Sequence, residues 1–216
     1  MKPLSLTLKN FGPYINETID FTKFEDSSLF LISGKTGSGK TTIFDGMSYA
    51  LFGESSGKLR LGKEMRSTFA DPSEATEVTL LFKHNEYLYE LNRLPEQELF
   101  KKRGTGVRKQ SAKISLIVKD AQGKELRAYS KRREVDELIQ ELLHLNANQF
   151  AQIVLLPQGE FRTFLIAKSD EKEKVLRNLF GTELYQLFSE NLKERLKICL
   201  LYTSPSPRDL ATSRMP

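Results

Sequence analysis

The chain has very few residues that could build a disulfide or a zinc site. Its 216 residues include one cysteine, Cys199, and two histidines, His84 and His144. A single thiol excludes an internal disulfide, and two isolated histidines are too few for a metal cluster. No run approaches the about eighteen apolar residues of a membrane-spanning helix, and the first residues lack the apolar core of a signal peptide. The sequence therefore favours a cytoplasmic globular protein.

The composition is that of a soluble domain with a mild basic excess. Hydrophobic residues make up 39% of the chain and charged residues 28%, and the formal net charge is +5. This length suffices for one substantial core or two small ones. The positive charge fits a polyanionic partner without requiring one.

Apolar patterning predicts an α/β domain with a mixed sheet. Residues 4–8 alternate as in a half-buried strand, and a turn at 10–13 leads to a second strand over 18–21. Residues 29–32 are continuously apolar, as expected of a strand buried on both faces. Residues 43–52 follow helical spacing, with Gly53 as the expected C-terminal cap.

The middle of the chain predicts a β-rich arm. Two hairpins are expected, one from residues 78–82 and 87–91, the other from 114–118 and 126–129. Three further expectations are an exposed connection over 54–76, a flexible basic loop over 101–113, and a helix from Ser130 onward, with Ser130 as its N-cap. Residues 152–156 are expected to form another buried strand.

The C-terminal region predicts a helix followed by a foreign tail. After Thr182, apolar residues recur three or four apart up to residue 198, too briefly to establish a coiled coil. We interpret residues 199–216, which hold three of the eight prolines, as a non-native tail, with a genuine linker as the alternative. The predicted organisation is a lobe over 1–182, the start of a coiled coil over 183–198, and this tail.

A phosphate-binding loop is the clearest functional signal. Residues 34–41, GKTGSGKT, match the pattern G-x-x-x-x-G-K-[ST]. Glycines let backbone N–H groups wrap a phosphate chain, and the following helix directs its positive N-terminus at the same anion. Lys40 is expected to reach the β- and γ-phosphates, and Thr41 to ligate Mg²⁺. The predicted nucleotide-binding residues are Gly34, Lys35, Thr36, Gly37, Ser38, Gly39, Lys40, Thr41 and Thr42.

The residues needed for hydrolysis are not evident. A P-loop ATPase also needs an acidic residue at the end of a neighbouring apolar strand. The one apolar run that leads to an aspartate ends at Asp120, which we interpret as a hairpin residue because a tight turn follows. The N-K-x-D stretch that recognises guanine is absent. The sequence therefore predicts nucleotide binding without a complete catalytic centre.

Several motifs resemble one particular ATPase family. These are Asn10-Phe11-Gly12-Pro13-Tyr14, the Walker loop continuing into TIFDG, residues 49–54 (YALFGE), Met65-Arg66-Ser67, and above all residues 156–161 (LPQGEF). Over about residues 1–198 the chain resembles the N-terminal lobe of the ATPase head in the SbcC family. These proteins are the large subunits of bacterial SbcCD nucleases and are related to chromosome-maintenance ATPases.

The resemblance implies half of an ABC-type ATPase head. Such a head is completed by a C-terminal lobe beyond a long coiled coil, and that lobe carries the signature L-S-G-G, the Walker B acid and a switch histidine, none of which occurs here. Gln158 would be the Q-loop residue, contacting Mg²⁺ or the attacking water. Lys40 and Gln158 are then the expected catalytic residues, and Thr41 and Gln158 the metal ligands. Residues 10–14 would approach the base and ribose, although Gly12 and Pro13 make a side-chain contact doubtful.

By this resemblance the cofactors are ATP and Mg²⁺, and the partners are an SbcD-like metallophosphoesterase nuclease, a second head and double-stranded DNA. The intact protein would hydrolyse ATP, whereas this chain alone would bind it. Clustered cations suit sequence-independent phosphate contact, although a solvated loop is the simpler interpretation. The DNA candidates are Arg60, Lys63, Arg66, Lys101, Lys102, Arg103, Arg108 and Lys109. The alternatives are a self-contained P-loop kinase or GTPase, and a DNA-tethering head without a nuclease.

Overall fold

The structure, a computed structural model, describes residues 1–24, 29–55, 62–101, 106–155 and 183–203. The chain divides into two units, Met1–Ala167 and Lys168–Pro216, and each is treated by itself. Among the described helices, none is both long and apolar enough to cross a bilayer.

A six-stranded sheet forms the body of the first unit, with strand order β2-β1-β3-β4-β7-β8. Its strands are β1 (Lys2–Phe11), β2 (Tyr14–Asp20), β3 (Glu77–His84), β4 (Tyr87–Leu94), β7 (Lys113–Lys119) and β8 (Glu125–Tyr129). Side chains alternate between the two faces of a strand. Alternate residues of β1, β3 and β4 are accordingly buried, including Leu6, Leu8, Leu80, Phe82 and Leu91.

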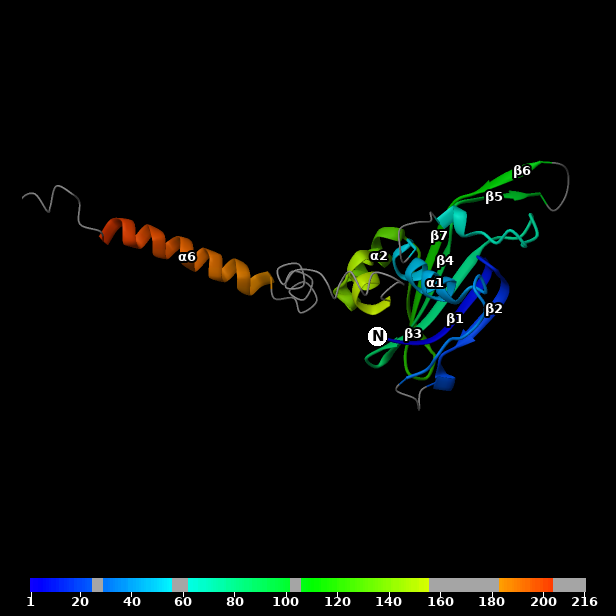
Figure 1. Ribbon diagram of the computed structural model, residues 1–216, viewed down its shortest axis with the longest axis horizontal. Coiled ribbons are helices and arrows are strands. Elements are labelled where there is room, and N and C mark those ends of the chain that lie inside the picture. The colour runs from blue at the N-terminus through cyan, green and yellow to red at the C-terminus, as the bar shows by residue number, and fades with distance from the viewer. Residues whose placement is uncertain (25–28, 56–61, 102–105, 156–182, 204–216) are drawn as a thin grey trace, which may run out of the picture. The chain divides into compact units, whose positions relative to one another are not determined.

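Two helices cover one face of this sheet. Helix α1 (Lys40–Phe52) lies across β1, β3 and β4, and α2 (Arg132–Leu143) packs beside it against β7 (Figure 1). A glycine at position 46 permits this approach, because a Cβ there would lie 2.6 Å from Leu8 Cδ2. The expected cap is confirmed, since Gly53 adopts φ 77° and its N–H donates to Tyr49 O at 2.8 Å.

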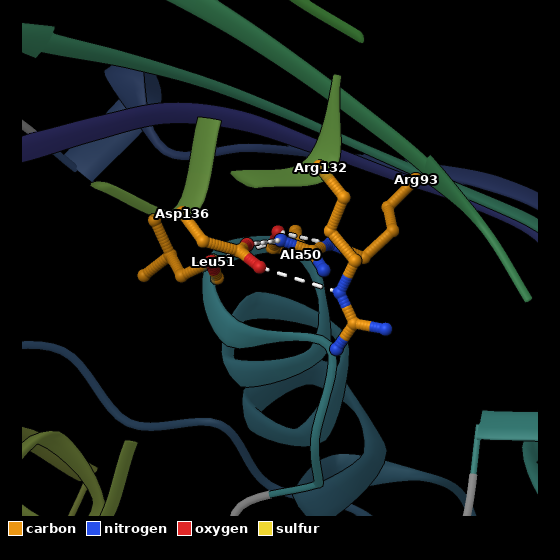
Figure 2. A network of polar contacts seen from close by, with 5 residues as sticks. All are labelled: Ala50, Leu51, Arg93, Arg132 and Asp136. Carbon is orange, nitrogen blue, oxygen red and sulfur yellow. Dashed lines mark hydrogen bonds and ion pairs between the residues drawn. The ribbon is translucent and has the colours of Figure 1, made fainter. Parts of the chain in front are cut away.

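A buried arginine joins the sheet to both helices. Arg93 on β4 is 5% exposed, and its guanidinium donates to Ala50 O at 3.0 Å and to Leu51 O at 3.2 Å. The same group pairs with Asp136 on α2 at 3.0 Å, and Arg132 approaches the other carboxylate oxygen of Asp136 at 3.3 Å (Figure 2). Burial lowers the pKa of Arg93, and the bond to Asp136 opposes that shift. The C-terminal carbonyls of α1 are thus satisfied by a side chain from the sheet.

The expected hairpins are confirmed, but the mixed sheet is not found among the described residues. The pairs β3–β4 and β7–β8 enclose the predicted ranges. Asp120 is a turn residue, since its carboxylate accepts from the N–H groups of Gln122 and Lys124. Every strand pairing between described residues is antiparallel. The parallel component was expected from residues 29–32, and these form no ladder here.

Three predictions of local structure are wrong. Residues 29–32 are not a buried strand: Leu29 and Leu31 are each 88% exposed. The predicted strand over 152–156 is not found in its described part either, because Ala151–Leu155 forms a π-helical turn after the short α3 (Ala147–Phe150). A short apolar run fits either structure, and no described strand edge pairs with it. Lys131, in extended conformation, precedes α2 instead of Ser130, because β8 keeps the chain extended to Tyr129.

Two predicted loops contain more structure than expected. The basic segment after residue 100 contributes β6 (Val107–Gln110), which pairs with β5 (Gln97–Phe100) in a separate hairpin that projects beyond the sheet (Figure 1). The connection over 54–76 is partly buried rather than exposed, since Met65, Ser67 and Thr76 are all at most 4% exposed. Residues 107–110 (VRKQ) show no alternation of apolar and polar residues, so the sequence pattern gives no signal for this strand.

Outside the first unit, the described part is one helix, α6 (Glu183–Thr203). It agrees with the predicted start but continues past Ile198. Its apolar stripe is exposed at Leu187, Leu192 and Leu196.

Candidate functional site

The phosphate-binding loop closes against the N-terminus of α1. Gly37 and Gly39 adopt φ 84° and 91°, a region that L side chains rarely occupy. Lys40 Nζ donates to Gly34 O at 2.7 Å and to Lys35 O at 2.8 Å. An ammonium group has three protons, so one remains for an anion at the centre of the loop. The first N–H groups of α1, from Lys40 to Thr42, have no intrahelical acceptor.

The turn between β1 and β2 packs directly on this loop. A Cβ on Gly39 would lie 2.5 Å from Pro13 Cγ, and a Cβ on Gly12 would lie 2.6 Å from Thr42 Cγ2. Tyr14 donates its hydroxyl proton to Gly39 O at 3.2 Å, and burial raises the pKa of this phenol. This hydrogen bond joins the turn to Gly39, the N-cap residue of α1, which is in the left-handed conformation.

A third segment completes the site. Gly12 N donates to Met65 O at 2.7 Å and Ser67 N to Asn10 O at 2.8 Å, so residues 65–67 lie antiparallel to the end of β1. The three segments enclose an open cavity of about 670 Å³. It is lined by Gly12, Pro13, Thr36, Gly37, Gly39, Lys40, Thr41, Thr42, Glu64, Arg66, Thr68 and Phe69.

The predicted nucleotide-binding residues divide into two groups. Six of them line the cavity: Thr36, Gly37, Gly39, Lys40, Thr41 and Thr42. Gly34, Lys35 and Ser38 instead shape the loop, for example through the Ser38 N–H, which donates to Lys35 O at 3.2 Å. The side chain of Thr42 is buried under Gly12, so it offers the cavity mainly its backbone N–H. Thr41 is exposed at the mouth, where a hydroxyl can reach a metal ion.

The donor set fits a triphosphate with Mg²⁺. Unpaired backbone N–H groups, a lysine ammonium and a threonine hydroxyl are the groups that P-loops use for phosphate and its metal. No cluster of three or more histidine, cysteine or acidic residues occurs in the part of the chain that the structure describes, so an all-protein metal cage is not found there. Magnesium on one hydroxyl and phosphate oxygens matches that ion's preference for few protein ligands. Gln158, the other predicted ligand, lies outside the described residues.

Sequence reasoning missed three residues that line this cavity, Glu64, Thr68 and Phe69. Glu64 belongs to the 3-10 turn Gly62–Met65, and Thr68 and Phe69 follow that turn in the chain. No sequence signal distinguishes them, because segment 54–76 has no periodic pattern. Only the pairing of residues 65–67 with β1 brings them to the loop.

Of the predicted DNA contacts, those on the β5–β6 hairpin are exposed. Lys101, Arg108 and Lys109 face solvent, and Lys109 pairs with Glu96 at 2.6 Å. Arg66 behaves differently, because its guanidinium donates to Glu74 O at 2.6 Å and Asp71 O at 2.8 Å. Lys63 lies in the 3-10 turn, and Arg60, Lys102 and Arg103 lie outside the described residues.

The fold and the loop define a P-loop nucleotide-binding protein. A family model described as "AAA domain" matches residues 5–198, and the chain belongs to this family. It is 45% identical over 199 residues to the SbcC protein of the SbcCD nuclease from Lactococcus lactis, covering 90% of this chain and 19% of that protein. The SbcC proteins of Staphylococcus aureus and Vibrio cholerae are 47% and 44% identical over 91% and 90% of the chain, again covering 19% of each.

These matches confirm the resemblance to the SbcC family, and the chain spans about a fifth of the length of these relatives. A solved structure from work on "ATP-driven dimerization and DNA stimulated activation of SMC ATPases" aligns with a TM-score of 0.44 at 16% identity, over 83% of this chain and 99% of that one. That likeness is too low to carry an argument.

Proposed function

We propose that the chain is the ATP-binding part of an ABC-type ATPase head in an SbcC-like DNA-processing nuclease complex. The observation that carries the nucleotide site is the loop itself: two left-handed glycines, the Lys40 ammonium held between two loop carbonyls, and the uncapped N-terminus of α1 at one cavity. Lys40 and the N-terminus of α1 supply positive charge, and the loop and α1 supply N–H donors for a phosphate chain.

In this proposal the chain binds ATP and needs a further protein segment to hydrolyse it. The described residues place no acid at the end of a buried strand beside Thr41. Leu29 and Leu31, directly before the loop, are 88% exposed, and apolar segments of this kind ordinarily pack against further protein. Relatives about five times longer have ample chain to supply such a partner segment. We assign Mg²⁺ to Thr41, with Gln158 as the second contact.

The test is a matched pair of lysine substitutions in one loop. Lys40→Ala should abolish binding of Mg-ATP in calorimetry, whereas Lys35→Ala, which removes the same charge from an exposed side chain, should bind within about three-fold of the wild type. The purified 216-residue chain should show no sustained turnover of ATP. Equal loss in both variants, or unchanged binding by Lys40→Ala, would contradict the placement of the site.

Glu64 favours a second candidate, a self-contained P-loop enzyme. It is a carboxylate on the wall of the cavity, and a phosphoryl-transfer enzyme needs one to hold the metal water or orient the nucleophile. Its position on an exposed 3-10 turn, rather than at a strand end, weighs against that role. Magnesium-dependent turnover by the wild-type chain that Glu64→Gln eliminates would establish this candidate instead.

In the complete complex we expect ATP to be held between two heads, and its hydrolysis to control access of double-stranded DNA to an SbcD-like metallophosphoesterase. The projecting β5–β6 hairpin is our candidate DNA contact, because its exposed cations Arg108 and Lys109 lie on a paired arm that projects beyond the sheet. Charge reversal at Arg108 and Lys109 should weaken DNA binding. It should also lower the slope of log binding constant against log salt concentration by the equivalent of about one to two phosphate contacts. Reversal of two exposed lysines elsewhere, Lys83 and Lys124, is the matched control.

The remaining alternative is a DNA-tethering head with no nuclease. Tagged full-length protein should copurify with a metallophosphoesterase-type nuclease if our proposal holds. Recovery of homodimeric heads with DNA but without that nuclease would favour the tether.

A further inference from the structure

Phe69 is an exposed aromatic residue at the rim of the phosphate-binding cavity. Its side chain is 72% exposed and lines the same cavity as the P-loop. A single exposed apolar residue needs no explanation by itself. Here, however, Phe69 lines the same cavity as the phosphate-binding loop, so a nucleotide bound there can cover its ring.

The backbone that carries Phe69 is held firmly. Residues 67–70 form a turn in which Phe69 N donates to Ser67 Oγ and Ala70 N to Ser67 O, each at 3.3 Å. Ser67 itself is anchored to Asn10 O of β1. The aromatic ring is therefore presented from a fixed position.

Buried polar contacts fix the rest of the segment. Arg66 Nη1 donates to Gln97 Oε1 at 3.1 Å, and Gln97 exchanges two hydrogen bonds with the backbone of Thr76, at 2.8 and 3.2 Å. Thr76 Oγ1 donates to Asn10 O at 3.1 Å. Strands β1 and β5 thus hold both ends of the loop that contains Phe69.

The cavity is large enough for a nucleotide, and few of its lining side chains suit a nucleobase. Its volume of about 670 Å³ lies within the range of small-molecule sites. The P-loop residues that line it bind the phosphates in our proposal, and Gly12 and Pro13 line it as well. Neither Gly12 nor Pro13 has a polar or aromatic side chain for the base, whereas Phe69, which lines the same cavity, has an aromatic ring.

We propose that Phe69 is the stacking platform for the nucleobase, an inference that rests on the proposed nucleotide binding. A nucleobase presents a flat π-face, and stacking on an aromatic side chain is favourable for every base. Phe69 thereby raises affinity for nucleotides over inorganic phosphates without selecting adenine from guanine. The ligand class that we assign to this cavity is therefore a nucleoside triphosphate.

The experiment compares a nucleotide with a ligand that has no base. Binding of Mg-ATP, Mg-GTP and magnesium tripolyphosphate to the 216-residue chain is measured by calorimetry for the wild type, Phe69→Ala and Phe69→Trp. Phe100→Ala is the matched control, because Phe100 is 55% exposed on β5 and does not line the cavity. The chain has no tryptophan, so Phe69→Trp also introduces a single tryptophan, which can be excited selectively, at the proposed contact.

Phe69→Ala should weaken ATP and GTP by about 5- to 100-fold and leave tripolyphosphate within about two-fold. Phe69→Trp should retain nucleotide affinity, and its fluorescence should be quenched by ATP but not by tripolyphosphate. Unchanged ATP affinity in Phe69→Ala, or an equal loss for tripolyphosphate, would overturn the stacking role while leaving the P-loop assignment intact. A wild-type chain that binds neither ligand would overturn the proposed function and this inference together.

Discussion

Replacing Arg93 by methionine should destabilise the first unit strongly. Methionine fills a similar volume but donates no hydrogen bonds. The substitution leaves Ala50 O and Leu51 O, both in fully buried residues, without the guanidinium that now satisfies them. It also removes one of the two arginine contacts of Asp136.

The magnitude follows from which groups remain buried. Replacing a whole buried ion pair by apolar residues can be neutral, because the desolvation cost of the charges disappears with them. Here two carbonyl acceptors and a half-buried carboxylate remain, and each unsatisfied buried group costs about 1–3 kcal/mol. Partial relaxation of the end of α1 lowers the sum, so we expect a loss of about 3 kcal/mol in the free energy of unfolding.

Thermal and urea denaturation followed by circular dichroism measure this loss. For a unit of this size, about 3 kcal/mol corresponds to a fall in melting temperature of roughly 6–12 °C. Arg133→Met is the control, since Arg133 is an exposed partner of Glu137 on the same helix as Asp136 and should melt as the wild type does. A melting temperature for Arg93→Met within about 2 °C of the wild type would refute the argument from buried carbonyls.

Two further perturbations test the packing around the site. Burial raises the pKa of Tyr49 to about 12 from 10.0, so the unfolded chain loses this proton first and stability should fall by about 2–3 kcal/mol between pH 10 and 12. Tyr49→Phe should flatten this alkaline decline in urea titrations; identical slopes would be inconsistent with the burial argument. Gly39→Ala should lower ATP affinity at least about ten-fold and more than Gly37→Ala, because a Cβ at position 37 meets no atom within 4 Å. Adding Pro13→Ala should partly restore the ATP affinity of Gly39→Ala and should not change that of Gly37→Ala. Equal losses of affinity at the two glycines would count against the clash with Pro13.

Local patterns were sufficient for much of the fold. The P-loop motif, α1 with its Gly53 cap, and both hairpins follow from glycine spacing, helical periodicity and strand alternation. These signals work because each depends on residues within one turn or one hairpin. The resemblance to SbcC proteins rested on equally local motifs.

The failures involve residues whose state depends on distant neighbours. The apolar run 29–32 was predicted as a buried strand, yet burial requires partner strands, and none pairs with it among the described residues. The same reason applies to residues 152–156, which were also predicted as a buried strand, whereas Ala151–Leu155 forms a π-helical turn after α3. The role of Arg66 in DNA binding stays a prediction, and the sequence alone did not indicate that its guanidinium donates to Asp71 O and Glu74 O.

The sequence by itself determined the phosphate-binding chemistry, since a loop motif encodes its own backbone conformation and its own lysine. Only the tertiary structure decided what surrounds that loop. The packing of Pro13 on Gly39, the antiparallel contact of residues 65–67 with β1, and the resulting place of Phe69 at the cavity all join segments far apart in the chain. Such contacts arise from side-chain packing and hydrogen bonds across the fold, which no local pattern specifies.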